Sequence, residues 1–168
     1  MQIPKVVNKL DDSVIKRNTS IYTEIAKKNN EVMTDISDLI RNQKGLLSTE
    51  KIDIPIAVVL SKFDIVAPIV PKDYTILKPS PHCYEKQFNL VDFNNVNSEV
   101  VSLIHSWDNE TVIFQLENNY KKYSCFATSA LGFNNYSDTH GRIGIPKPHR
   151  IEDPILWLLK ENGVIKGK

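Results

Sequence analysis

The spacing of apolar residues along the chain predicts helices that alternate with strands. Between Asn18 and Lys44 the apolar side chains recur at steps of three, four and seven residues, with charged and amide side chains between them. This spacing predicts a long amphipathic helix with one stripe against a core, and Gly45 is placed to end it in a left-handed cap. The stripe consists of Ile21, Ile25, Val32, Ile36, Leu39 and Ile40.

Two short apolar runs predict strands. The first is Ile56 to Leu60, which follows Pro55, and the second is Tyr123 to Ala130, in which Cys125 and Ala127 alternate with Phe126 and Thr128. A near-continuous aliphatic stretch is typical of a buried parallel strand.

Helical patterns surround the second strand. Apolar positions from Val96 to Leu116 predict one or two helices, and Asp153 followed by Pro154 predicts the N-cap and first turn of a last helix, which Gly163 ends. We expect Trp107 and Trp157, which lie in these apolar stripes, in the core. The order helix, strand, helix, strand, helix predicts an α/β fold with few parallel strands and right-handed crossovers.

Residues 66–95 interrupt this order. They contain four prolines together with several aromatic residues, so we interpret them as an extended, packed insertion. Two strands are few, since sheets usually carry about four to six. Either the insertion supplies further strands, or another chain completes the sheet.

Composition limits the classes of partner. The 168 residues include 21 Lys and Arg against 20 Asp and Glu, so bulk charge gives no argument for binding nucleic acid or an anionic membrane. No apolar stretch approaches the roughly 20 residues of a membrane span, and the first residues lack the pattern of a signal peptide. Two cysteines are too few for a disulfide framework, so we expect a cytoplasmic protein.

Polar residues follow both predicted strands. Ser61, Lys62 and Asp64 come directly after the first strand, and Ser129 and Ala130 end the second. Ligands of α/β folds bind beyond the carboxyl ends of parallel strands. The Asp64 carboxylate offers two acceptors for the N1–H and N2–H donors of guanine, the Lys62 stem can cover the base, and a backbone N–H near Ala130 can meet its carbonyl group.

These residues resemble the two base-binding motifs of P-loop GTPases, Asn/Thr-Lys-x-Asp and Ser-Ala-Lys/Leu. The segment from Ile54 to Asp64, the run Ser129-Ala130-Leu131-Gly132 and the stretch from Arg150 to Leu159 are similar to the carboxyl-terminal half of bacterial double-GTPase and related conflict-system GTPase-like domains. The resemblance implies a three-layer sandwich and a guanine site formed by Ser61, Lys62, Asp64, Ser129, Ala130 and Leu131.

The chain departs from that family in one decisive respect. It contains no Gly-x-x-x-x-Gly-Lys-Ser/Thr, the loop that holds the phosphates and the Mg²⁺ hydroxyl ligand. We therefore expect residues 1–168 to form a single, incomplete domain that recognises GTP or GDP by its base, with no hydrolysis by this chain alone. Mg²⁺ would enter only with a phosphate-binding half, which a missing N-terminal half or a partner protein would supply.

Other interpretations remain open. Asn8 to Asp11 also matches the short guanine pattern but lacks a preceding strand, and Ser61 to Asp64 could be a strand-to-loop junction whose charges face water. The chain could instead be a non-enzymatic interaction module that docks a partner, or a second copy of itself, through an unpaired strand edge. The histidines His82, His105, His140 and His149 are too scattered to predict a metal site.

Overall fold

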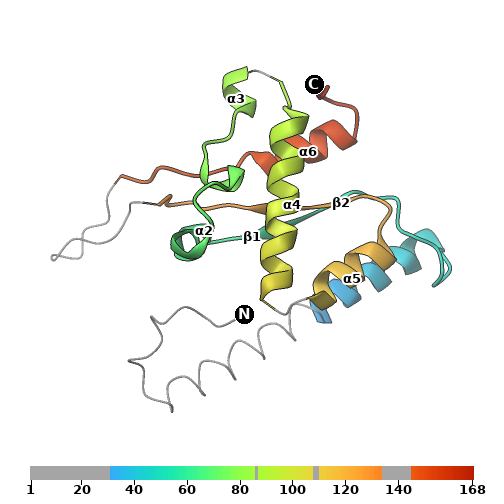
Figure 1. The fold of residues 1–168 in the computed structure, drawn as a ribbon. Helices are drawn as coiled ribbons and strands as arrows, with labels where there is room; N and C mark the ends of the chain where they lie inside the picture. Colours follow the sequence, from blue (N-terminus) through green and yellow to red (C-terminus); the bar gives the residue numbers. More distant parts are fainter. Residues whose placement is uncertain (1–30, 86, 108–109, 134–144) are drawn as a thin grey trace, which may run out of the picture. The chain divides into compact units, whose positions relative to one another are not determined.

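Two parallel strands form the only sheet of the described chain, and helices pack against it (Figure 1). The computed structural model describes residues 31–85, 87–107, 110–133 and 145–168. By its internal contacts the chain divides into two units, Met1–Glu50 and Lys51–Lys168.

The described part of the first unit is a helix over residues 31–44 and the turn that follows it. Gly45 has φ +65°, and the Leu46 N–H donates to the Arg41 carbonyl while the Gly45 N–H donates to that of Asn42, which is a Schellman cap. The predicted cap is confirmed. Three residues of the apolar stripe that was predicted to pack against a core, Val32, Ile36 and Leu39, are exposed, so the prediction is wrong at these positions. Ile21, Ile25 and the Asn8 to Asp11 motif lie outside the described residues.

The sheet of the second unit consists of β1 (Ile56–Leu60) and β2 (Tyr123–Ala127), with Ile56 opposite Tyr123 and Leu60 opposite Ala127. The prediction of a mixed α/β fold with few parallel strands is confirmed. β2 ends three residues before the predicted limit, because Ser129 leaves the ladder and pairs with His149 in an antiparallel bridge.

Short helical turns replace the predicted extended insertion. They are α2 (Phe63–Val66), the 3₁₀ turns η2 (Ala67–Ile69) and η3 (Thr75–Leu77), and α3 (His82–Glu85). The Glu99 carboxylate holds η3 by accepting the N–H groups of Thr75 and Ile76 at 2.7 and 2.8 Å. The insertion is therefore anchored to the body of the unit, and it adds no strand to the sheet among the described residues.

Two helices separate the strands, α4 (Leu90–Ser106) and α5 (Glu110–Asn119). α4 begins six residues earlier than predicted because the Asn89 side chain caps it by accepting the Asp92 N–H. Figure 1 shows α4 crossing the strands. Its Asn97 side chain accepts the Cys125 N–H at 2.8 Å and so occupies the outer edge of β2. Trp107 follows α4 and is 39% exposed, so its prediction as a core residue is wrong.

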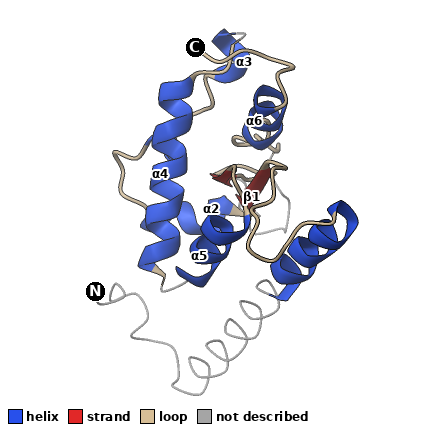
Figure 2. Cartoon of the chain, turned by 90° about the vertical axis from the view of Figure 1, so that its right-hand side faces the viewer, coloured by secondary structure: helices blue, strands red, loops and turns tan. Residues whose placement is uncertain are grey.

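The last helix, α6 (Asp153–Glu161), packs against β1, and Figure 2 shows it beside the strands. Gly163, at φ +73°, follows its end as predicted. The helix carries Trp157 into an aromatic cluster with Phe88, Phe93 and Phe126. Glu152 rather than Asp153 occupies the N-cap, and the buried Asp153 carboxylate instead pairs with Arg150, so the predicted capping role is wrong. No helix in the described residues is both long and apolar enough to cross a membrane.

Candidate functional site

The loops that leave β1 and β2 are joined by backbone hydrogen bonds. The Thr128 N–H donates to the Leu60 carbonyl at 2.9 Å, and the Phe63 N–H donates to the Thr128 carbonyl at 3.0 Å. These bonds continue the pairing of the two parallel strands beyond their last residues. Residues 61–64 and 128–131 therefore lie side by side at the carboxyl edge of the sheet.

Asp64 and Ser129, which are 65 residues apart in the sequence, meet in this edge. The Ser129 hydroxyl donates to Asp64 Oδ1 at 2.5 Å and accepts the Gly132 N–H at 2.9 Å. Ser129 is 1% exposed, whereas Asp64 is half-buried. The structure thus brings together one residue from each of the two predicted motifs and fixes the orientation of the carboxylate.

The other predicted site residues lie on the surface around this pair. Ser61, Lys62, Ala130 and Leu131 are all exposed. The Ala130 N–H makes no hydrogen bond to any residue that the structure describes. An aspartate carboxylate has about four lone-pair sites, so Asp64 keeps acceptor capacity beside the Ser129 bond. The edge therefore offers a carboxylate acceptor, a backbone donor and a lysine stem.

The backbone at Lys62 turns the Asp64 loop back over the strand end. Lys62 has φ +55°, a left-handed conformation that is uncommon for a residue other than glycine. The next residue, Phe63, is completely buried and packs edge-on against Phe133 at a centroid separation of 6.0 Å. Burial of this ring holds the turn, because the loop cannot relax at Lys62 without pulling Phe63 out of the core.

His149 connects this edge to the insertion. Its backbone exchanges two hydrogen bonds with Ser129, at 3.0 and 2.8 Å, and its Nε2 lies 2.7 Å from the Ile76 carbonyl oxygen. The ring lies 4.2 Å from that of Phe133, measured between centroids. Burial lowers the pKa of His149 below its ordinary value, although the bond to Ile76 acts in the opposite direction. The neutral ring donates from Nε2 to the carbonyl oxygen.

Arg150, the next residue, is the centre of a buried ionic cluster. Its side chain is 1% exposed and forms a fork with Asp92 at 2.8 and 3.0 Å, and it also donates to Asp153 at 2.8 Å. It further donates to the carbonyls of Lys78 and Thr75 at 2.9 and 3.1 Å. Burial opposes the charge, but the two carboxylates outweigh it and raise the pKa of Arg150 above its ordinary value. All five N–H groups of a guanidinium are used in this way.

His82 joins the cluster from α3, and with Asp92 and Asp153 it forms a group whose geometry could be that of a metal site. One ring nitrogen of His82 and one carboxylate oxygen of each aspartate lie within 4.8 Å of one another, and His82 Nε2 is 3.9 Å from an oxygen of each aspartate. However, His82 Nδ1 accepts the Asn89 N–H at 3.1 Å, so the proton of the neutral ring lies on Nε2. A metal-binding histidine normally donates from its second nitrogen. The guanidinium of Arg150 also occupies both aspartates, and the group fits an ionic cluster better than a metal centre.

Sequence reasoning did not identify this cluster. Buried charged residues are rare unless they are paired, and the partners of Arg150 lie 58 and 3 residues away along the chain. The one local signal is Arg150-x-x-Asp153 at the start of a helix. Comparison with known proteins adds no assignment, because no family model, curated protein or solved structure matches the chain.

Proposed function

We propose that the carboxyl edge of the two strands recognises a guanine base. The observation that carries this proposal is the Ser129 to Asp64 hydrogen bond, which orients a carboxylate between two adjacent strand ends. Guanine presents two neighbouring donors and a carbonyl acceptor. Groups of the complementary kinds are the Asp64 carboxylate, the exposed Lys62 stem and the Ala130 N–H, which makes no hydrogen bond to a described residue.

The proposal is limited to base recognition within a P-loop GTPase-like three-layer sandwich. The sequence provides no loop of the kind that holds nucleotide phosphates and Mg²⁺, so we assign this chain no hydrolytic step. GTP or GDP would require a phosphate-binding half on a partner or on a preceding segment. Base recognition can be tested without that half.

The test is a titration of the isotope-labelled chain with GMP, AMP and XMP, followed by amide chemical shifts. We expect GMP to shift the amide signals of Lys62 and Ala130, and AMP to leave them unchanged. Asp64→Asn replaces one acceptor by a donor, so we expect the preference to move from guanine toward xanthine by about 1–3 kcal/mol.

Asp73→Asn is the matched control, since Asp73 is an exposed aspartate of the insertion that lies outside the site. It should bind as the unmodified chain does. Equal shifts with GMP and AMP, or an Asp64→Asn chain with unchanged preference, would refute base recognition.

The outer edge of β1 supports a second candidate function, the docking of a partner strand. Ile56 and Leu60 bond toward β2, so by alternation the backbone groups of Ala57 and Val59 point away from it. No described residue pairs with that side of β1, and Val59 is 42% exposed. An apolar strand with an unpaired edge is a template for pairing with another chain.

A second copy of the chain is the partner that can be tested directly. Under this candidate the chain self-associates, and light scattering at increasing concentration gives a mass above that of the monomer. Val59→Pro removes one outward N–H without touching the bonds to β2, and it should restore the monomer. Val59→Thr keeps that N–H and should still associate. A monomeric unmodified chain would exclude self-pairing through β1.

A further inference from the structure

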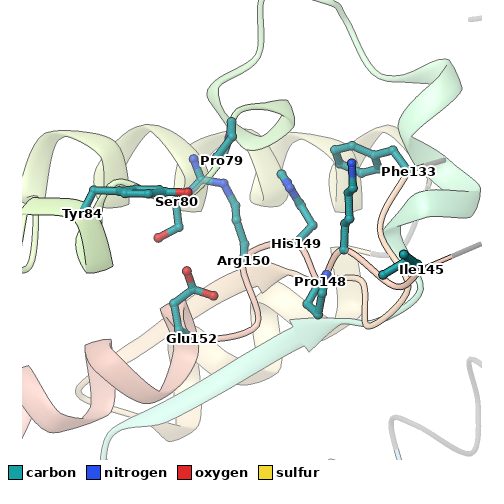
Figure 3. Close-up of a pocket in the computed structure, with 10 residues that line it drawn as sticks. Pro79, Ser80, Tyr84, Phe133, Ile145, Pro148, His149, Arg150 and Glu152 are labelled. Atoms are coloured by element: carbon teal, nitrogen blue, oxygen red, sulfur yellow. The ribbon is translucent and has the colours of Figure 1, made fainter. Parts of the chain in front are cut away.

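A groove lies between the insertion and the segment that leads into α6. Its volume is about 630 Å³, and it is lined on one side by Pro79, Ser80 and Tyr84 and on the other by residues between Ile145 and Glu152, with Phe133 at one end (Figure 3). None of the residues proposed to recognise guanine lines it. The groove is therefore a separate candidate site.

Two polar groups that have no hydrogen-bond partner among the described residues lie at one end of this groove. Ser80 is 5% exposed, and its hydroxyl makes no hydrogen bond within the described residues. The Glu152 carboxylate is half-buried and likewise makes no hydrogen bond or ion pair to a described residue. Figure 3 shows both groups turned toward the same space, with the Tyr84 ring beside them. Buried polar groups are nearly always paired, so this end of the groove is suited to a polar ligand.

The charge of this end favours a cation. Arg150 lines the groove, but its N–H groups are all donated to Asp92, Asp153 and two carbonyls, so none is left for an anion. Glu152 adds a third carboxylate to the two that already surround this single guanidinium. Behind the groove, Asp153 Oδ1 makes no hydrogen bond to the described residues, and His82 Nε2 faces it at 3.9 Å.

The rest of the lining suits an apolar stem and a planar head. Pro79 and Pro148 both line the groove, and Tyr84 is 82% exposed, so a face of its ring is available for stacking. A guanidinium stacks on aromatic rings and donates several hydrogen bonds in one plane. Lys147 also lines the groove, but it is exposed and its ammonium can extend into water.

We propose that this groove binds an arginine side chain of a partner polypeptide. The guanidinium pairs with the Glu152 carboxylate and stacks on Tyr84, while its alkyl stem contacts the prolines that line the groove. This site is independent of guanine recognition, and each can fail without the other.

The test uses N-acetyl-arginine methylamide, with the citrulline analogue as an uncharged probe of the same shape. We expect the arginine probe to shift the amide signals of Ser80, Tyr84 and Glu152, and to bind at least tenfold more tightly than the citrulline probe. Glu152→Gln should weaken the arginine probe at least tenfold, and Tyr84→Ala at least threefold. Glu110→Gln, which changes an exposed glutamate at the start of α5, is the matched control and should bind as the unmodified chain does.

Thermal unfolding of each variant shows whether it is folded, and both Tyr84 and Glu152 are accessible enough to be replaced without disturbing the core. Two results would overturn the proposal. One is equal binding of the arginine and citrulline probes, or no binding of either. The other is a folded Glu152→Gln chain that binds the arginine probe as tightly as the unmodified chain.

Discussion

Replacement of Arg150 by methionine tests whether the ionic cluster holds the insertion on the body of the unit. Methionine keeps much of the side-chain volume and removes the charge and all five donors. Two carboxylates then lose their counterion, one on Asp153, whose side chain is 3% exposed, and one on Asp92, whose side chain is 13% exposed. The carbonyls of Thr75 and Lys78 also lose a donor.

The expected loss follows from these unpaired groups. Removing one partner of a buried ion pair costs about 3–5 kcal/mol, because the remaining charge stays buried. The free energy of unfolding of a whole domain is only about 5–15 kcal/mol. With a urea dependence of about 2 kcal/mol per molar, the midpoint of unfolding should fall by about 1.5–2.5 M.

Urea unfolding monitored by the fluorescence of the buried Trp157 measures this loss. Arg150→Lys keeps the charge but not the fork, so its midpoint should lie between those of the other two chains. The triple variant Arg150→Met, Asp92→Asn, Asp153→Asn removes the stranded charges and should recover at least half of the loss. A loss below about 1 kcal/mol, or a triple variant no more stable than Arg150→Met, would refute the interpretation that the cluster anchors the insertion.

Three further predictions concern single positions. Gly132 and Gly163 both have positive φ, but a Cβ at Gly132 would lie 2.0 Å from a backbone carbonyl oxygen, whereas one at Gly163 would meet nothing within 4 Å. Alanine at Gly132 should therefore lower the free energy of urea unfolding by about 1–3 kcal/mol more than alanine at Gly163 does. Equal losses would contradict the close contact at Gly132. Burial lowers the pKa of His149 below 6.5, so the unfolded chain binds the proton more readily, and stability should be complete above pH 6.5 and fall as the pH drops toward the folded-state pKa. Urea midpoints measured from pH 7.5 to 5 check this, and the same slope in a His149→Gln chain would exclude His149 as its source. Burial raises the pKa of the Cys125 thiol to about 11. In a Cys83→Ser chain, which has Cys125 as its one cysteine, we expect no reaction with a thiol reagent at pH 8 until urea unfolds the protein. Rapid labelling of the folded chain would show that the thiol is accessible.

Elements with a strong local pattern were predictable from the sequence. β1 lies at the predicted residues because five consecutive apolar residues follow a proline and precede polar ones. The cap at Gly45 and the start of α6 near Pro154 depend on backbone preferences that act within a few residues. The earlier start of α4 also had a local signal, the Asn89 side chain three residues before Asp92.

The candidate sites were predictable only in part. Asp64 and Ser129 were placed at neighbouring strand ends because parallel strands direct their carboxyl ends to one edge. Arg150 was not expected in the interior, because arginine is rarely buried unless it is paired and its main partner, Asp92, lies on a distant helix. The groove beside Ser80 depends on how the insertion packs, and its prolines indicate only where regular structure stops.

The Asn97 side chain makes the two margins of the sheet chemically unequal. A single amide oxygen satisfies the Cys125 N–H that a third strand beyond β2 would otherwise use, and the helix that carries Asn97 stands in the path of such a strand. Growth of the sheet by further strands is thus one-directional, from β1 outward. In any larger continuous sheet that includes this chain, β2 would therefore be an edge strand.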